Sequence, residues 1–150
     1  MSSASTTAAA AGPGSGSGPG HMSVNELKTL MDDSSLRAGV DFLVVDVRRT
    51  DLDEPGAVII PRAINVPAQT FQQTVPTLVT VLSHIPKIIF HCNSSKGRGT
   101  RTAGWYAAEL DRQGVTSSKA YILTGGMIAW KEAYPDEVVS TATATATATA

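Results

Sequence analysis

The chain has little cysteine and no long hydrophobic run. Cys92 is the single cysteine among 150 residues, which excludes an internal disulfide and a zinc site built on several thiolates. No apolar run approaches the roughly 18 residues that a membrane-spanning helix needs, and the N-terminus lacks the pattern of a secretory signal. The net charge of −1 gives no support for nucleic-acid binding. We therefore expect a soluble cytoplasmic protein, with the nucleus as an alternative location, that binds neither membrane nor nucleic acid.

Charged residues are also missing from both ends of the chain. Residues 1–22 have none and consist mostly of Ala, Ser, Gly, Pro and Thr, while residues 141–150 alternate Thr and Ala. Because such segments cannot bury a core, we predict a disordered tag or linker at 1–22 and a disordered tail at 140–150. The pair His21-Met22 is typical of a cloning junction; a natural low-complexity tail is the alternative. Residues 23–139 have the size of one compact domain.

Helical and strand patterns alternate through this domain. Ser23 and Glu26 form a capping-box pattern at the start of a helix that ends near Asp33. Strands are predicted at 42–47, 63–67, 87–91 and 120–123, and helices at 75–85, at 100–113 and through Ala129 and Trp130. Pro76 is expected in the first turn of its helix. The alternation predicts a three-layer α/β fold, with a mostly parallel sheet of four or five strands flanked by helices.

The loop after the third predicted strand carries the strongest chemical signal. It reads HCNSSKGRGTR from His91 to Arg101, and it begins at the carboxyl end of a parallel strand, where such sheets bind ligands. Its glycines allow a tight backbone nest whose N–H groups hold an anion at a helix N-terminus. The fork of Arg98 fits a tetrahedral oxyanion in two-point contact.

The same surroundings act on the thiol of Cys92. A helix N-terminus and nearby cations lower the pKa of a thiol from about 8.5, so Cys92 is expected to be a nucleophilic thiolate at neutral pH. The alternative is a small hydrophobic residue that ends a strand. Cys92 and Arg98 are thus the predicted catalytic residues. The predicted binding residues are Asn93, Ser94, Ser95, Lys96, Gly97 and Arg98. The predicted supporting residues are His91 and Thr100. For Lys96 and Arg101, the alternative is a charged side chain in solvent.

Three carboxylates follow the first strand on a loop at the same sheet edge, namely Asp51, Asp53 and Glu54. One of them is a candidate general acid for a phosphate leaving group, and a solvated surface carboxylate is the alternative. Asp46 and Arg48 are expected to serve the fold by pairing or capping. No metal site is predicted.

Four stretches together resemble the rhodanese fold: VVDVR at 44–48, AINVP at 63–67, the Cys92 loop, and LTGGMIAW at 123–130. The His-Cys-x5-Arg pattern is similar to the subgroup shared by cell-cycle dual-specificity phosphatases and eukaryotic arsenate reductases, whereas rhodanese-fold sulfurtransferases usually have a shorter loop. The stretch SKGRG at 95–99 looks most like the arsenate reductases, since the cell-cycle phosphatases carry an acidic residue at the place of Gly97. Ile59 and Arg62 depart from the family's usual His and Gly and predict an altered turn.

The resemblance implies an arsenate reductase or a phosphatase that forms a covalent intermediate on Cys92 and has no bound cofactor. For arsenate, the second thiol must come from outside because the chain has no second cysteine. The resemblance implies glutathione and glutaredoxin as these external reductants. The expected ligand is a small oxyanion or a phosphoester. Two alternatives stay open: a sulfurtransferase that carries a Cys92 persulfide, and a non-catalytic rhodanese module that binds an anion or a partner.

Overall fold

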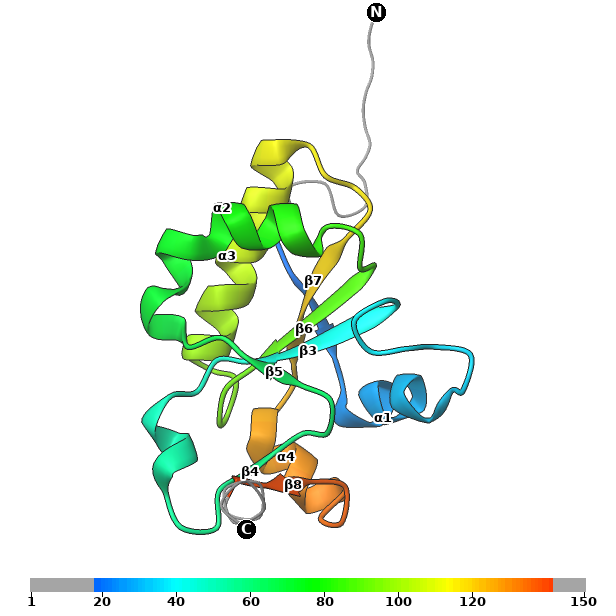
Figure 1. Ribbon diagram of the computed structural model, residues 1–150, viewed down its shortest axis with the longest axis vertical. Helices are drawn as coiled ribbons and strands as arrows, with labels where there is room; N and C mark the ends of the chain where they lie inside the picture. The colour runs from blue at the N-terminus through cyan, green and yellow to red at the C-terminus, as the bar shows by residue number, and fades with distance from the viewer. Residues whose placement is uncertain (1–17, 142–150) are drawn as a thin grey trace, which may run out of the picture.

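A parallel β-sheet lies between two pairs of helices in the computed structural model, which describes residues 18–141 (Figure 1). The strand order is β2-β7-β6-β3-β5. The strands of this sheet are β2 (Gly20–Met22), β3 (Phe42–Asp46), β5 (Ile64–Asn65), β6 (Lys87–His91) and β7 (Lys119–Leu123). The helices are α1 (Val24–Asp32), α2 (Phe71–Leu82), α3 (Arg98–Gln113) and α4 (Gly126–Ala133). The predicted α/β class and the parallel sheet of up to five strands are confirmed.

Shorter elements complete the described chain. Two 3-10 turns, η1 (Thr50–Asp53) and η2 (Ala68–Thr70), follow β3 and β5. Strand β4 (Val58–Ile59) pairs in antiparallel fashion with β8 (Val139–Ser140) and so ties the C-terminal end of the described chain to the segment between β3 and β5. None of the helices described between residues 18 and 141 has the length and hydrophobicity to span a bilayer.

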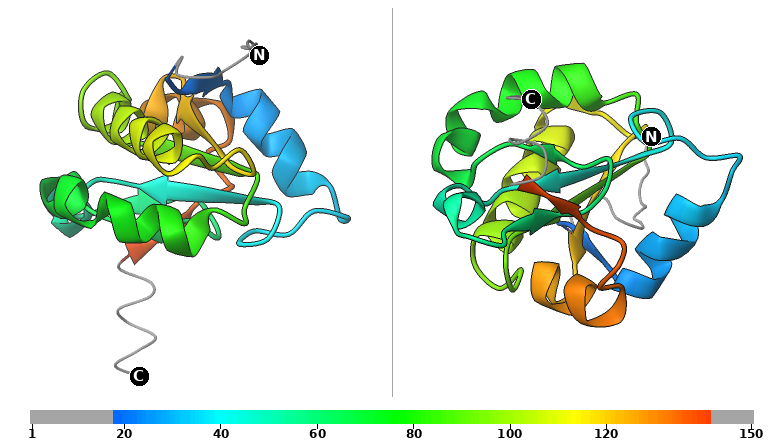
Figure 2. Two further views of the ribbon diagram at one scale, coloured as in Figure 1. Left: turned by 90° about the horizontal axis from the view of Figure 1, so that it is seen from above. Right: turned by 60° about the horizontal axis from the view of Figure 1, so that its bottom comes forward.

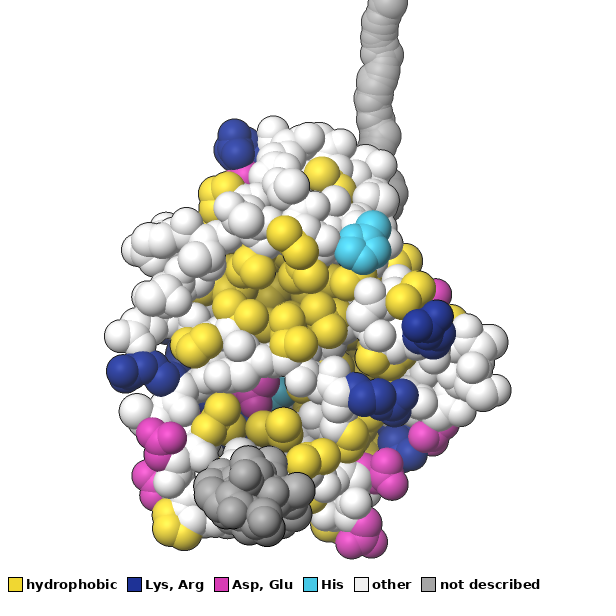
Figure 3. Space-filling view, in the orientation of Figure 1, with side chains coloured by type: hydrophobic (Ala, Val, Ile, Leu, Met, Phe, Trp, Pro, Cys, Tyr) yellow, Lys and Arg dark blue, Asp and Glu magenta, His cyan; other side chains and the backbone are white. Residues whose placement is uncertain are grey.

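Side chains point alternately to the two faces of the central strands, and this explains why helices cover both faces of the sheet. Leu43 and Val45 of β3 pack in one core with residues of α2 and α3, whereas Phe42 and Val44 pack in a second core with residues of α1 and α4. Neighbouring residues of a strand point to opposite faces, so a continuously apolar strand fills both cores. The helix pairs accordingly lie on opposite sides of the sheet (Figure 2). Hydrophobic side chains also gather on the surface between α2 and β5 (Figure 3).

The N-terminal boundary of the domain differs from the prediction. Residues 20–22, assigned to the linker from composition, form the edge strand β2, which pairs in parallel with β7. Met22 is buried in the second core, and its carbonyl accepts a hydrogen bond from the Thr124 N–H at 2.9 Å. The rest of the predicted linker up to residue 17, and the tail from residue 142, lie outside the described residues. At the other boundary, Ser140 belongs to β8 rather than to a tail.

Two helices begin earlier than predicted. Helix α2 starts at Phe71, so Pro76 is its sixth residue and not part of its first turn. Phe71, Val75 and Val79 form the buried stripe of α2, and their packing offsets the backbone hydrogen bond that proline removes. Helix α3 starts at Arg98, because the Arg101 N–H already bonds to the Gly97 carbonyl at 2.9 Å. By contrast, the predicted capping box of α1 is present, with both reciprocal bonds between Ser23 and Glu26.

Candidate active site

The Cys92 loop joins the carboxyl end of β6 to the first turn of α3. Cys92 is only 3% exposed. The Ser95 N–H donates to Cys92 Sγ at 3.2 Å, and Ser95 adopts a left-handed backbone with φ 60°. This turn folds the loop back over the sulfur, so that backbone N–H groups surround Cys92 as the sequence predicts for an anion-binding nest.

These N–H groups lower the pKa of the Cys92 thiol. Burial is the largest single influence on Cys92 and raises its pKa. Hydrogen bonds from the backbone of Gly99, Ser95 and Gly97, together with the charge of Arg98, outweigh burial, so the pKa of Cys92 lies below its ordinary value. The geometry therefore favours the nucleophilic thiolate form.

Two backbone N–H groups at the N-terminus of α4 donate hydrogen bonds to the Cys92 loop. The Met127 N–H donates to the Cys92 carbonyl at 3.1 Å, and the Ile128 N–H donates to the Asn93 carbonyl at 3.0 Å. Gly126 makes this approach possible, since a Cβ there would lie 2.6 Å from the Asn93 oxygen. The sequence predicts a helix through Ala129 and Trp130 and a family resemblance over residues 123–130, but not that this helix supports the Cys92 loop; the paired glycines at 125 and 126 are the available signal.

Arg98 is paired with a residue from a distant loop. Its Nη1 and Nη2 donate to Asp51 Oδ1 and Oδ2 at 2.7 and 3.0 Å. The Arg98 guanidinium holds the pKa of Asp51 well below its usual range. A carboxylate that stays ionised has no proton to donate, and this geometry argues against Asp51 as the general acid.

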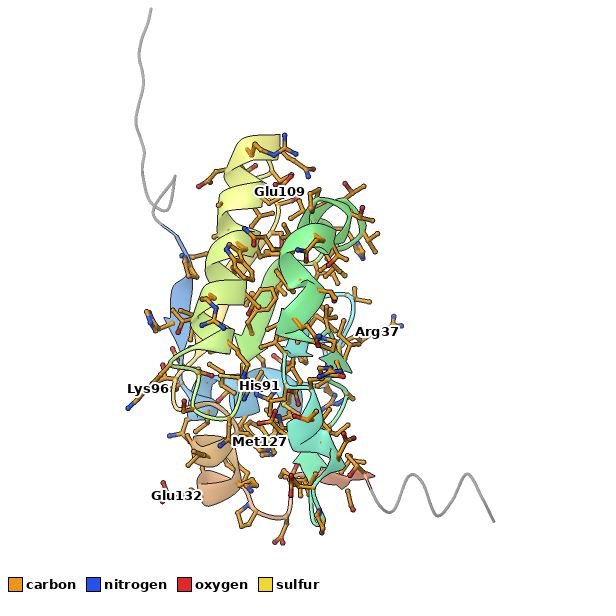
Figure 4. The ribbon with its side chains drawn as sticks, turned by 90° about the vertical axis from the view of Figure 1, so that its left-hand side faces the viewer. Arg37, His91, Lys96, Glu109, Met127 and Glu132 are labelled. Carbon is orange, nitrogen blue, oxygen red and sulfur yellow. The ribbon has the colours of Figure 1, made fainter. Side chains whose placement is uncertain are left out.

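The remaining predicted residues divide between the loop and the surface. Thr100 Oγ1 donates to the Ser95 carbonyl at 2.6 Å and so braces the turn, while Ser94 Oγ accepts from the Lys96 N–H at 3.4 Å. Asn93 is exposed. The side chain of Lys96 is exposed and reaches away from the protein, whereas His91 lies inside (Figure 4).

Two of the three candidate acids remain at the surface. Asp53 and Glu54 are both exposed. Glu54 and Asp51 line an open pocket of ≈ 420 Å³ together with Asn93 and Lys131. The pocket places Glu54 on the rim of the Cys92 loop, but neither Asp53 nor Glu54 has a hydrogen bond to that loop within the part of the chain that the structure describes.

Three buried polar residues lie next to the Cys92 loop, namely Asp46, Arg48 and His91. Arg48 Nη2 donates to Asp46 Oδ2 at 2.7 Å and to the Val58 carbonyl at 2.8 Å, which fits the expected structural role of this pair. His91 Nδ1 lies 3.0 Å from the Cys92 carbonyl, so Nδ1 carries the proton. Burial lowers the pKa of His91 although Asp46 opposes this effect, and the ring is neutral at pH 7. His91 thus contacts the loop backbone, and its supporting role stays a prediction.

One supporting residue was missed. The side-chain amide of Asn65 donates to the carbonyls of Asp46 and Arg48 at 2.9 and 2.8 Å and so fixes the chain that leads from β3 to Asp51. Arg62, three residues earlier, takes a left-handed backbone with φ 67°, the conformation that favours glycine. Within residues 18–141, no group of three or more His, Cys, Asp or Glu side chains is placed to bind a metal ion.

A comparison with protein families identifies the fold. The family model described as "Rhodanese-like domain" matches residues 23–133. This chain belongs to the rhodanese-like domain family. The match covers the Cys92 loop, the β3 region and the whole stretch that supports the loop, so the resemblance stated from the sequence motifs is confirmed.

Relatives of two kinds are similar to this rhodanese-like chain. Arsenical-resistance protein 2 of Saccharomyces cerevisiae is 33% identical over 97 residues, covering 61% of this chain and 75% of that protein. The dual specificity phosphatase ibp1 of Schizosaccharomyces pombe is 32% identical over 111 residues, covering 63% and 78%. These are the two kinds of protein that the His-Cys-x5-Arg pattern resembled.

Solved structures show the same fold. An As-Sb reductase from Leishmania major superposes with a TM-score of 0.65 at 21% identity, covering 88% of this chain and 99% of that one. A yeast protein tyrosine phosphatase of the rhodanese family superposes with a TM-score of 0.63 at 24% identity, covering 81% and 90%. At these identities the superpositions support the fold alone.

Proposed function

We propose that this protein is a cysteine-thiolate enzyme that acts on a tetrahedral oxyanion, with arsenate as its first candidate substrate and a phosphoester as its second. The observation that carries the proposal is the cradle around Cys92. Backbone N–H groups of Ser95, Gly97 and Gly99 converge on a sulfur beside Arg98. Oriented N–H donors and an arginine fork bind the oxygens of an anion and stabilise the charge that develops on them.

For dihydrogen arsenate, the Cys92 thiolate attacks arsenic, a sulfur–arsenic bond forms and an arsenic–oxygen bond breaks, and the leaving oxygen departs as water with both arsenate protons. A thiol from another molecule then attacks the sulfur of this adduct. A disulfide forms, and arsenic keeps the bonding electron pair, so that As(V) becomes As(III). The chain has a single cysteine, and glutathione with glutaredoxin is the proposed source of the second thiol.

For a phosphoester, the same attack forms a sulfur–phosphorus bond as the bond to the leaving oxygen breaks, and water hydrolyses the sulfur–phosphorus bond in a second step. The leaving alkoxide or phenolate then needs a proton. Asp51 is ionised and paired with Arg98, and this pairing favours arsenate, because dihydrogen arsenate itself carries the two protons that its leaving oxygen takes. Glu54, on the rim of the neighbouring pocket, is the remaining candidate acid of that loop near the site.

A turnover assay with two substrate arms tests the proposal. One arm supplies arsenate with glutathione, glutaredoxin and a reducing system, and the other supplies a chromogenic aryl phosphate. We expect turnover in the arsenate arm, and we expect Cys92→Ser to abolish it by several orders of magnitude because the nucleophile is gone. Turnover only with the aryl phosphate would make the protein a phosphatase.

Silence in both arms would contradict the oxyanion chemistry. Thiosulfate-to-cyanide sulfur transfer that depends on Cys92 would then indicate a sulfurtransferase. A protein that is silent in all three assays but binds arsenate equally well with Cys92→Ser would be a binding module.

A further inference from the structure

The ion pair between Arg98 and Asp51 joins two parts of the chain that are 47 residues apart. Asp51 lies on η1 after β3, and Arg98 is the first residue of α3. Both side chains are about one-third exposed, at 30% and 34%, so the pair lies at the opening of the site and not in the core. Two parallel hydrogen bonds fix the plane of the guanidinium, which a single contact would leave free to rotate.

Counting donors shows what the pair leaves for a ligand. A guanidinium has five N–H groups. Asp51 takes one on Nη1 and one on Nη2, which leaves three, including the one on Nε. The positive charge of Arg98 also lies near enough to Cys92 to lower the pKa of its thiol. Asp51 therefore occupies the edge of the guanidinium formed by Nη1 and Nη2. The remaining N–H groups are available to an oxyanion bound above the Cys92 sulfur.

Asp51 is itself held in place. Its Oδ1 accepts from the Arg49 N–H at 3.4 Å, and its carbonyl accepts from the Glu54 N–H at 3.5 Å. Upstream, Asn65 fixes the carbonyls of Asp46 and Arg48. A flexible arginine loses rotamer freedom when it binds an anion, and a partner that orders the side chain beforehand lowers that cost.

We propose that Asp51 is a positioning residue for oxyanion binding: its carboxylate holds the Nη1–Nη2 edge of Arg98, so that the remaining donors face the anion above Cys92. This proposal rests on the proposed function, since it needs an oxyanion to bind there. It replaces the proton-donating role considered for Asp51 with an electrostatic and geometric one.

The test measures binding without chemistry. Inorganic arsenate is titrated calorimetrically into the full-length Cys92→Ser protein and into the same protein carrying Asp51→Asn, which keeps the shape of the side chain and removes its charge. We expect Asp51→Asn to weaken arsenate binding about tenfold, the scale of one charge-assisted hydrogen-bonded contact. Asp51→Glu restores a carboxylate on a longer stem and is expected to recover part of the loss.

Two controls separate positioning from folding. Asp111→Asn removes an exposed carboxylate at the other end of α3 and should leave arsenate binding unchanged within twofold. Asp51→Asn and Asp51→Glu should have the same midpoint of thermal unfolding. A difference in arsenate binding between two equally folded variants then reflects the carboxylate and not a general structural defect.

The outcomes also separate the two proposals. Arsenate binding that is equal or tighter with Asp51→Asn would overturn the positioning role, because Asp51 would then be neutral or a competitor for Arg98. A loss that Asp51→Glu does not recover at all would overturn it as well. If the Cys92→Ser protein binds neither arsenate nor phosphate, the oxyanion function itself fails.

Discussion

A buried thiol normally keeps its proton, because a thiolate loses the solvation that water provides. Cys92 is buried and its pKa is nonetheless lowered, since three backbone N–H groups and Arg98 replace that solvation. Ser95 makes this possible by taking a left-handed backbone that turns its N–H toward the sulfur. At the scale of residues, the site is therefore a set of fixed dipoles arranged around one atom, which is the arrangement that stabilises charge with little reorganisation.

Replacing Arg98 by lysine tests whether the arginine fork matters. Lysine keeps the positive charge but loses the planar, two-point contact with an oxyanion. We expect Arg98→Lys to lower kcat/KM by roughly 10²–10³-fold, as for the loss of an oxyanion donor. Arg37→Lys, at an exposed arginine, is the matched control and should retain activity. Similar activity in both variants would contradict the bidentate role of Arg98.

Asp46 supports the fold through a buried pair with Arg48. Removing one partner leaves the other charge buried and unpaired, so we expect Asp46→Asn to reduce the free energy of unfolding by about 3–5 kcal/mol in urea unfolding at pH 7. The pKa of Asp46 is lowered in the folded chain: burial alone would raise it, and the hydrogen bond from Arg48 is the strongest of the influences that lower it. Its stabilising effect is therefore present above about pH 4 and is lost as the pH falls. A loss below about 1 kcal/mol at pH 7 would show that Arg48 finds other partners.

Three elements meet at the carboxyl edge of the sheet. The β6–α3 loop carries the sulfur, the turn η1 carries Asp51, and the N-terminus of α4 donates to the loop carbonyls. Helix α4 is short, but its first N–H groups have no partner within the helix and are free to bond elsewhere. At the scale of elements, α4 thus acts as a platform for the Cys92 loop.

Gly126→Ala tests this platform. The added methyl group would lie 2.6 Å from the Asn93 oxygen and 2.7 Å from the Cys92 oxygen, both backbone atoms that cannot move without shifting the loop. We expect a loss of about 1–3 kcal/mol in the free energy of unfolding and a larger proportional loss of turnover. Gly104→Ala is the matched control, since its Cβ would meet no atom within 4 Å. Unchanged turnover in Gly126→Ala would show that the loop does not depend on α4.

The central elements could be predicted because their signals are local. The apolar runs of β3 and β6 fill two cores at once, and the capping box of α1 needs only Ser23 and Glu26. Strand β2 could not be predicted, because Gly20 and His21 pair through their backbone and show no apolar alternation. The start of α2 was misplaced because proline is favoured in a first turn, whereas packing of Phe71 extends the helix.

The site could be predicted only as far as it is contiguous. Cys92, Ser95 and Arg98 are close in sequence and the loop pattern placed them together. The pairing of Arg98 with Asp51 depends on how η1 lies against α3, and no spacing rule links residues 47 positions apart. The sequence indicates that Asp51 is a carboxylate at the carboxyl edge of the sheet. It does not show the pairing with Arg98, which keeps that carboxylate ionised.

At the scale of the whole molecule, the fold surrounds the Cys92 thiol with hydrogen-bond donors that lower its pKa. The sheet brings loops that follow β3 and β6 to one edge, as parallel sheets do. The rhodanese-like chain has one cysteine, so any thiol chemistry measured on the intact protein reports on Cys92 alone.

The most direct test of the account is the rate at which iodoacetamide alkylates Cys92 across pH 5 to 9, with and without arsenate, followed by intact mass. Because the pKa of Cys92 lies below its ordinary value, we predict that the alkylation rate rises and levels off at a lower pH than the rate of free cysteine measured alongside. We also predict that arsenate protects the thiol in a saturable manner. A rate that rises only above about pH 8.5, the range of an ordinary thiol, without protection by arsenate, would contradict the account.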